Sequence, residues 1–157
     1  GTLMLPWALA SAIAITASKR LLARFGPATV LRTGMLLQAS GLLLMALLPQ
    51  PHVALAGLLF ALMGAGGSLC SSTAQTLAFH GVEGEALGDA SALWNLNRQL
   101  SFCLGTAAIA LLLALAMQWL PAHATRVALG LAAVLTLLPL ALLRRPQQLS
   151  FPQPENA

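Results

Sequence analysis

Long, nearly uninterrupted apolar runs fill residues 3–143, and the few charges in this stretch fall in short clusters between the runs. Helices of water-soluble proteins carry a polar face, whereas these runs are apolar on every side, as a helix surrounded by lipid is. Hydrophobic residues make up 58% of the chain and charged residues 8%, compared with about a quarter charged in ordinary soluble domains. The sequence therefore predicts an all-α integral membrane protein.

Five apolar segments are separated by links that contain glycine, proline or polar residues, and the segments lack the alternation of barrel strands. We expect spans at about 3–17, 30–48, 53–78, 90–119 and 125–143. A membrane-spanning helix needs about 20 residues, and the first segment is short of that length. The segments predict one transmembrane bundle over residues 1–145, followed by a polar tail over 146–157 that we expect to be disordered and cytoplasmic.

The basic residues indicate how the bundle is oriented in the membrane. Of the eight Lys and Arg residues, Arg126 falls on one side of the predicted topology, and the other seven fall on the opposite side: Lys19, Arg20, Arg24, Arg32, Arg98, Arg144 and Arg145. Because basic loops stay in the cytoplasm, we expect a multi-pass protein of the cell inner (plasma) membrane, with its basic loops and C-terminus cytoplasmic. The basic residues form no stripe interleaved with aromatics, which argues against nucleic-acid binding.

The sequence shows no grouping typical of an enzyme. Cys70 and Cys103 lie within apolar runs without a metal-ligand spacing, and we interpret them as packing residues. The third link holds His80, Glu83, Glu85 and Asp89. Its glycines favour a solvated loop over a metal site. Since no Ser-His-Asp grouping, phosphate loop or dinucleotide fingerprint is present, we expect no catalytic, cofactor-binding or metal-binding residues.

Strongly polar side chains interrupt the fourth segment: Asn95, Asn97, Arg98 and Gln99. Such side chains are costly in lipid, so they are expected to face protein or a water-filled cavity. Asn95 shares a helix face with Arg98 and with Gln99. Arg98 either extends to the inner interface or binds an acidic group.

The third segment carries a stripe of small or polar residues at a spacing of four: Gly64, Ser68, Ser72, Thr76 and His80. Gln75 lies beside this stripe. Small residues at this spacing allow two membrane helices to approach closely, but the same stripe is compatible with the lining of a cavity. Both interpretations remain open at this stage.

Two stretches resemble a known family. The link Arg24-Phe25-Gly26-Pro27 resembles the cytoplasmic loop motif of major facilitator superfamily transporters, in which Arg24 and Gly26 match and Ala23 replaces the usual acid. The stretch from Gly88 to Asn95, continued by Arg98-Gln99-Leu100 and Gly105-Thr106-Ala107, looks like the penultimate span of fourteen-span drug:proton antiporters of the EmrB/QacA type. Together the similarities cover roughly residues 1–145.

This resemblance implies that the segments are five of the six helices in the C-terminal bundle of a transporter. The N-terminal half would be the missing partner, with a substrate pathway between the halves. It implies proton-coupled efflux of drug-like, amphipathic organic compounds by alternating access, with the proton as coupling ion and no other cofactor. The resemblance also implies that the proton-coupling carboxylates lie in the missing half. The sequence is consistent with this, since no ionisable residue lies at the middle of a predicted span.

The resemblance also suggests a candidate site of six residues: Gln75, Asn95 and Gln99 lining the substrate pathway, Arg98 as a helix-end charge, and Arg24 and Gly26 in the cytoplasmic loop motif. Two alternatives remain. One is an importer of a sugar, nucleoside or organic acid on the same fold. The other is a small, non-transporting membrane protein of five spans.

Overall fold

The computed structural model describes residues 4–48, 52–82, 84 and 86–142. These residues form four α-helices and no strand: α1 (Met4–Leu47), α2 (Val53–Ala78), α3 (Ala86–Trp119) and α4 (Ala124–Leu142). Within this part of the chain, α1, α2 and α3 are long and apolar enough to cross a membrane, and α4 is a shorter apolar helix. The tail expected at 146–157 lies outside the described residues.

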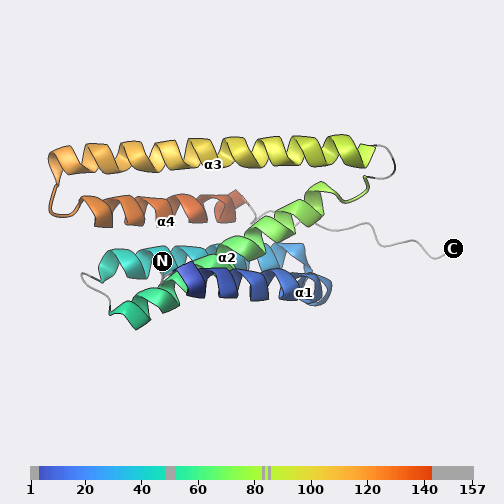
Figure 1. The fold of residues 1–157 in the computed structure, drawn as a ribbon, viewed down its shortest axis with the longest axis horizontal. Coiled ribbons are helices and arrows are strands. Elements are labelled where there is room, and N and C mark those ends of the chain that lie inside the picture. The colour runs from blue at the N-terminus through green and yellow to red at the C-terminus, as the bar shows by residue number, and fades with distance from the viewer. Residues whose placement is uncertain (1–3, 49–51, 83, 85, 143–157) are drawn as a thin grey trace.

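A single residue, Gly26, divides α1 into two arms. Its backbone angles (φ 76°, ψ 160°) are not helical, and they belong to a region that is almost closed to residues with a Cβ. Figure 1 shows the chain reversing here, so that the arms over 4–25 and 27–47 run in opposite directions. Each arm has about 20 residues, the length that a bilayer requires.

The link expected at residues 18–27 is therefore not a loop. The first arm stays helical through Phe25, because Lys, Arg, Leu and Ala are all good helix formers, and only Gly26 interrupts it. Pro27 begins the second arm at the first helical position, where its missing N–H removes no hydrogen bond. Lys19, Arg20 and Arg24 thus lie on the last turns of a helix.

Helix α2 packs against both arms of α1 at glycines. A Cβ added to Gly66 would lie 2.6 Å from the backbone nitrogen of Gln38 and 2.6 Å from the carbonyl oxygen of Gly34, both on the second arm. On another face of α2, a Cβ added to Gly64 would lie 2.6 Å from the carbonyl oxygen of Trp7 on the first arm. The helices therefore approach backbone to backbone, which maximises van der Waals contact where lipid provides no hydrophobic drive.

The stripe on α2 is divided between two environments. Gly64 is buried in the contact with the first arm, and Ser68 and Ser72 are half-buried. Thr76 and His80, nearer the end of the stripe, are exposed. Packing against a neighbouring helix therefore explains the residues at the beginning of the stripe, whereas the residues at its end are exposed.

The core of this layer is built from small and medium side chains. Ala14, Val30 and Leu69 form its central cluster, one from each arm and one from α2. Thr73 is fully buried and donates its hydroxyl hydrogen to the carbonyl oxygen of Leu69 at 2.7 Å. The polar side chain is thereby satisfied within its own helix, and the close approach of the arms is preserved.

Helix α3 lies at the edge of the molecule. It packs on α4, which in turn packs on α1, as Figure 1 shows. None of the described residues of α3 is buried. With 34 residues, α3 is about 51 Å long, well beyond the roughly 30 Å of a hydrocarbon core. It begins at Ala86, one turn before the expected start of the fourth segment.

Candidate functional site

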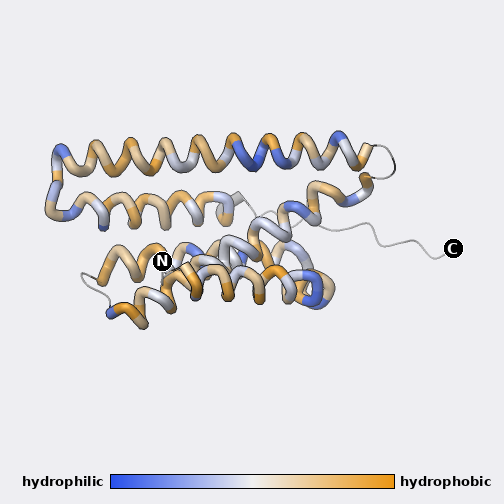
Figure 2. Tube along the Cα trace, in the orientation of Figure 1, coloured by the Kyte–Doolittle hydropathy of each residue, from blue (hydrophilic) through white to orange (hydrophobic). Residues whose placement is uncertain are grey.

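The polar side chains of Asn95 and Gln99 belong to one face of α3, and this face continues toward the C-terminal end of the helix. Asn95 and Gln99 are one turn apart, and Phe102, Thr106 and Ile109 follow them at spacings of three and four. This is the spacing of neighbours along one side of a helix. Of these five residues, Ile109 alone is half-buried, and the other four are exposed. Figure 2 shows the polar band as the blue stretch of α3.

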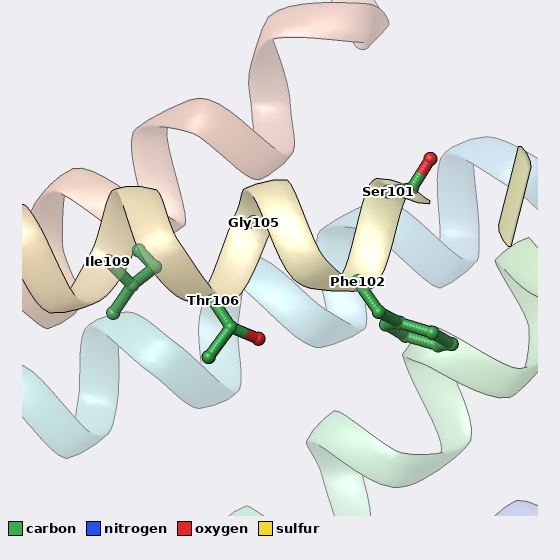
Figure 3. Close-up of a pocket in the computed structure, with 5 residues that line it drawn as sticks. All are labelled: Ser101, Phe102, Gly105, Thr106 and Ile109. Atoms are coloured by element: carbon green, nitrogen blue, oxygen red, sulfur yellow. The ribbon is translucent and has the colours of Figure 1, made fainter. Parts of the chain in front are cut away.

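A groove of about 360 Å³ lies along this face, lined by Ser101, Phe102, Gly105, Thr106 and Ile109. Figure 3 shows Phe102, Thr106 and Ile109 projecting from the same side of α3, with Ser101 on the other. A Cβ added to Gly105 would meet no atom within 4 Å, so the missing side chain leaves a notch between Phe102 and Ile109. The groove offers apolar surface beside a hydroxyl group, with the amides of Asn95 and Gln99 one to two turns away.

Arg98 lies beside this face, and its side chain is exposed. The Cζ atom of its guanidinium is 5.8 Å from the centroid of the Phe102 ring, within reach of a cation–π interaction. Arg98 and Trp119 are about 31 Å apart along the helix, at about 1.5 Å per residue. This separation is close to the thickness of a hydrocarbon core, so the two residues fit opposite interfaces of a bilayer.

Gln75 does not lie at this groove. It is exposed on α2, and among the described helices α2 and α3 do not pack along their length. A ring contact joins the two helices near their connection, with the centroids of Phe79 and Trp94 6.3 Å apart. Of the three expected pathway residues, Asn95 and Gln99 therefore share a face, and Gln75 stands apart from them.

The cytoplasmic loop motif lies at the reversal of α1. Arg24 is exposed on the last turn of the first arm, with its Cζ atom 5.4 Å from the centroid of the Phe25 ring. A Cβ added to Gly26 would meet nothing within 4 Å, so its backbone angle alone favours glycine there. Beside the turn is a hollow of about 230 Å³, lined by Leu21, Phe25, Thr29, Val30, Thr33 and Leu69.

Sequence reasoning overlooked Gln38. This half-buried amide lies in the second arm of α1, and its Oε1 atom would be 3.5 Å from a Cβ added to Gly67 on α2. The sequence offered one sign that this residue could matter, because it is a single glutamine within an apolar segment. Phe102 and Thr106 were also overlooked as site residues, although their spacing from Asn95 places them on its face.

The two cysteines and the residues of the third link lie in different environments. The thiol of Cys70 lies 3.7 Å from the carbonyl oxygen of Leu31, at the contact between α2 and the second arm. Cys103 is exposed on α3. His80 and Asp89 are exposed, and Glu83 and Glu85, the other residues weighed for a metal site, lie outside the described residues.

Comparison with known proteins gives one family match. The sequence model described as Major Facilitator Superfamily matches residues 1–157, which is the whole chain. Neither the curated proteins nor the solved structures include a significant match to it.

Proposed function

The chain belongs to the major facilitator superfamily, a family of membrane transporters and not of enzymes, and on this premise we propose that it is part of a proton-coupled exporter. Its substrates are drug-like, amphipathic organic compounds, which move outward by alternating access. The α3 groove carries this proposal. Its apolar wall and the neutral amides of Asn95 and Gln99 suit a compound with both an apolar body and polar groups.

In this proposal the two arms of α1 and helices α2, α3 and α4 are five spans of the inner membrane. The ends of the helices near Gly26 and the C-terminus face the cytoplasm, in keeping with the basic residues of the first arm. The exposed surface of α3 faces the N-terminal half of the transporter across the substrate pathway. The absence of buried residues on α3 supports this placement, because a polar band on a helix is stable in a membrane only when protein or water covers it.

We propose that proton entry supplies the energy for transport. Among the described residues of α3, Arg98 is the one charged group within a turn of the groove. We place it at the inner interface, where it anchors the end of α3. The carboxylates that take up the coupling proton belong, in this proposal, to the other half of the transporter.

Removing both amides tests the role of the groove. We expect Asn95→Ala combined with Gln99→Ala to lower efflux about tenfold at unchanged protein level, because two hydrogen bonds of about 0.7 kcal/mol each are lost. Efflux of a fluorescent dye from energised cells measures the effect. Gln118→Ala, which removes an exposed amide at the far end of α3, is the matched control and should not change efflux.

The same assay tests direction and coupling. Collapse of the proton gradient should stop efflux from wild-type cells. Energised uptake of the dye would show an importer instead, and normal efflux by the double variant would remove Asn95 and Gln99 from the pathway.

We expect Arg24→Ala to insert normally and to transport about two- to fivefold more slowly. Arg24 is exposed, so its removal costs little folding energy, but its charge contributes up to about 1 kcal/mol to contacts that the turn at Gly26 makes as the two halves of the transporter move. Initial rates of efflux against substrate concentration measure the change. Arg20→Ala, which removes an exposed charge from the same arm outside the motif, is the control. Unchanged kinetics for Arg24→Ala would exclude a role in the conformational cycle.

A further inference from the structure

The hollow beside the turn of α1, which we call the turn hollow, combines a buried wall with an exposed rim. Val30 and Leu69 belong to the core cluster of this layer and form the buried wall. Phe25, Thr29 and Thr33 also line the hollow, and all three are exposed. A cavity of about 150 Å³ is enough to bind benzene. The turn hollow, at about 230 Å³, therefore has room for a segment of a hydrocarbon chain.

The lining of the turn hollow suits an apolar occupant. Apart from Thr29 and Thr33, every lining residue is aliphatic or aromatic. The hydroxyl group of Thr33 donates to the carbonyl oxygen of Thr29 at 2.9 Å. It is therefore satisfied within its own helix and needs no hydrogen bond from an occupant.

The turn hollow lies near the end of two spans. Thr33 is the lining residue of the second arm farthest from Gly26, and it is about 10 Å from the turn along an α-helix. Each arm is long enough to cross the hydrocarbon core, so the turn lies near the boundary of the core. The hollow is therefore at the depth of the first methylene groups of a lipid chain, next to the layer of lipid phosphates.

A cation lies at the rim of the turn hollow. The Cζ atom of Arg24 is 5.4 Å from the centroid of the Phe25 ring, which forms part of the wall. The side chain of Arg24 is exposed, and helices α1 and α2, which form the hollow, contain no Asp or Glu. No carboxylate of these two helices therefore competes for the guanidinium, whose planar fork can donate two hydrogen bonds to a phosphate.

We propose that the turn hollow is a binding site for an anionic phospholipid. The first methylene groups of one acyl chain pack against Val30 and Leu69, and the phosphate accepts hydrogen bonds from the guanidinium of Arg24. A phospholipid with a choline headgroup carries a second, positive charge that opposes this attraction, so the site prefers a lipid with a net negative charge. The site is separate from the α3 groove, and it does not depend on the direction of transport or on proton coupling.

Phosphatidylglycerol and phosphatidylcholine with identical acyl chains test this proposal, because they differ in the net charge of the headgroup. Each lipid carries a photoreactive diazirine near the carbonyl end of one chain. It is added at the same low fraction to nanodiscs of unlabelled phosphatidylcholine that contain the protein. After irradiation, mass spectrometry of peptides measures the label on the lining residues. We expect about fivefold more label from phosphatidylglycerol, the ratio that corresponds to about 1 kcal/mol for one cation.

Two results with the wild-type chain would overturn the proposal. One is equal labelling by the two lipids, and the other is the absence of label from the lining residues, which would mean that the hollow is closed to lipid. Glycerol phosphate in solution distinguishes a phospholipid from a soluble phosphate compound. It should not reduce the labelling, and competition by it would assign the site to a soluble anion instead.

Two charge variants locate the preference. Arg24→Gln should lower labelling by phosphatidylglycerol to the level of phosphatidylcholine. Lys19→Gln is the matched control, because Lys19 is an exposed cation of the same arm but lies two residues from Leu21, a rotation of about 200°. It should retain the preference. Loss of the preference in both variants, or in neither, would exclude Arg24 as the group that selects the lipid.

Two threonine variants test the hollow itself. Thr33→Leu places a larger apolar side chain in the lining, and we expect it to lower labelling by both lipids about fourfold, the value of one methylene group displaced. Thr16→Leu makes the same change outside the lining and should have no effect. Both threonines are exposed, and each donates its hydroxyl hydrogen to a carbonyl oxygen of its own helix. Unchanged labelling of Thr33→Leu would place the acyl chain outside the turn hollow and contradict the proposal.

Discussion

Substitution of Gly66 by alanine is expected to lower the apparent melting temperature of the protein by about 3–10 °C. The added Cβ would collide with backbone atoms of Gln38 and Gly34 at 2.6 Å, and backbone cannot move aside as a flexible side chain can. Forcing the helices apart should cost about 1–3 kcal/mol. For a chain of this size, each kcal/mol corresponds to roughly 2–4 °C. Thermal unfolding in detergent, followed by size-exclusion chromatography, measures the change.

The neighbouring glycine provides a matched control. The three atoms nearest to a Cβ at Gly67 all belong to the side-chain amide of Gln38, and the closest lies at 3.5 Å, which is ordinary contact. Gly67→Ala makes the same chemical change one residue away and should shift melting by no more than about 2 °C. Equal shifts for Gly66→Ala and Gly67→Ala would mean that the backbone-to-backbone contact does not determine the stability of this layer.

Substitution of Gly105 by leucine is expected to lower efflux more than tenfold without changing the melting temperature. Nothing lies within 4 Å of a Cβ at this position, so the new side chain meets no obstacle from within the chain. It would instead occupy the notch between Phe102 and Ile109 and fill the groove proposed to hold substrate. Dye efflux from energised cells, together with thermal unfolding of the protein purified from those cells, separates loss of transport from loss of folding.

Gly130→Leu is the comparison for this experiment, because Gly130 also has no atom within 4 Å of its Cβ position but lies on α4, outside the groove. We expect it to retain both stability and transport. Normal efflux by Gly105→Leu would place the substrate elsewhere. Equal loss in both variants would indicate a general effect of bulk on these two helices.

The sequence was sufficient to identify apolar helices but not their contacts. In lipid, a side chain that faces a neighbouring helix and one that faces an acyl chain can be equally apolar, so hydropathy locates a helix without orienting it. Helix α2 has the same bounds as the third apolar segment, Val53–Ala78. Nothing in its composition showed that Gly64 and Gly66 would contact different arms of α1.

At residues 18–27 the sequence predicted a loop, and this prediction was wrong because the residues up to Phe25 are helical. The charges of this stretch lower the local hydropathy, which suggested a loop, yet lysine and arginine favour helices as strongly as leucine does. Hydropathy reports the expected solvent of a residue, and it does not report the backbone conformation. The backbone break required the one residue that tolerates positive φ with extended ψ, Gly26.

Part of the candidate site could be predicted from the sequence. Asn95 and Gln99 were noticeable because amides are rare in spans, and helical spacing alone puts them on one face. Phe102 and Thr106 were not noticeable, because such residues are ordinary in membrane helices. The position of Gln75 relative to these residues depends on how α2 and α3 are placed, which helical spacing within one segment does not determine.

The order of contacts along the chain has a consequence for biogenesis. Among the described helices, the two arms of α1 and helix α2 make the most extensive contacts, and they are consecutive in sequence, so their packing needs no residue that follows α2. This unit can therefore assemble while the ribosome is still synthesising α3, and α4 docks against α1 after it has been made.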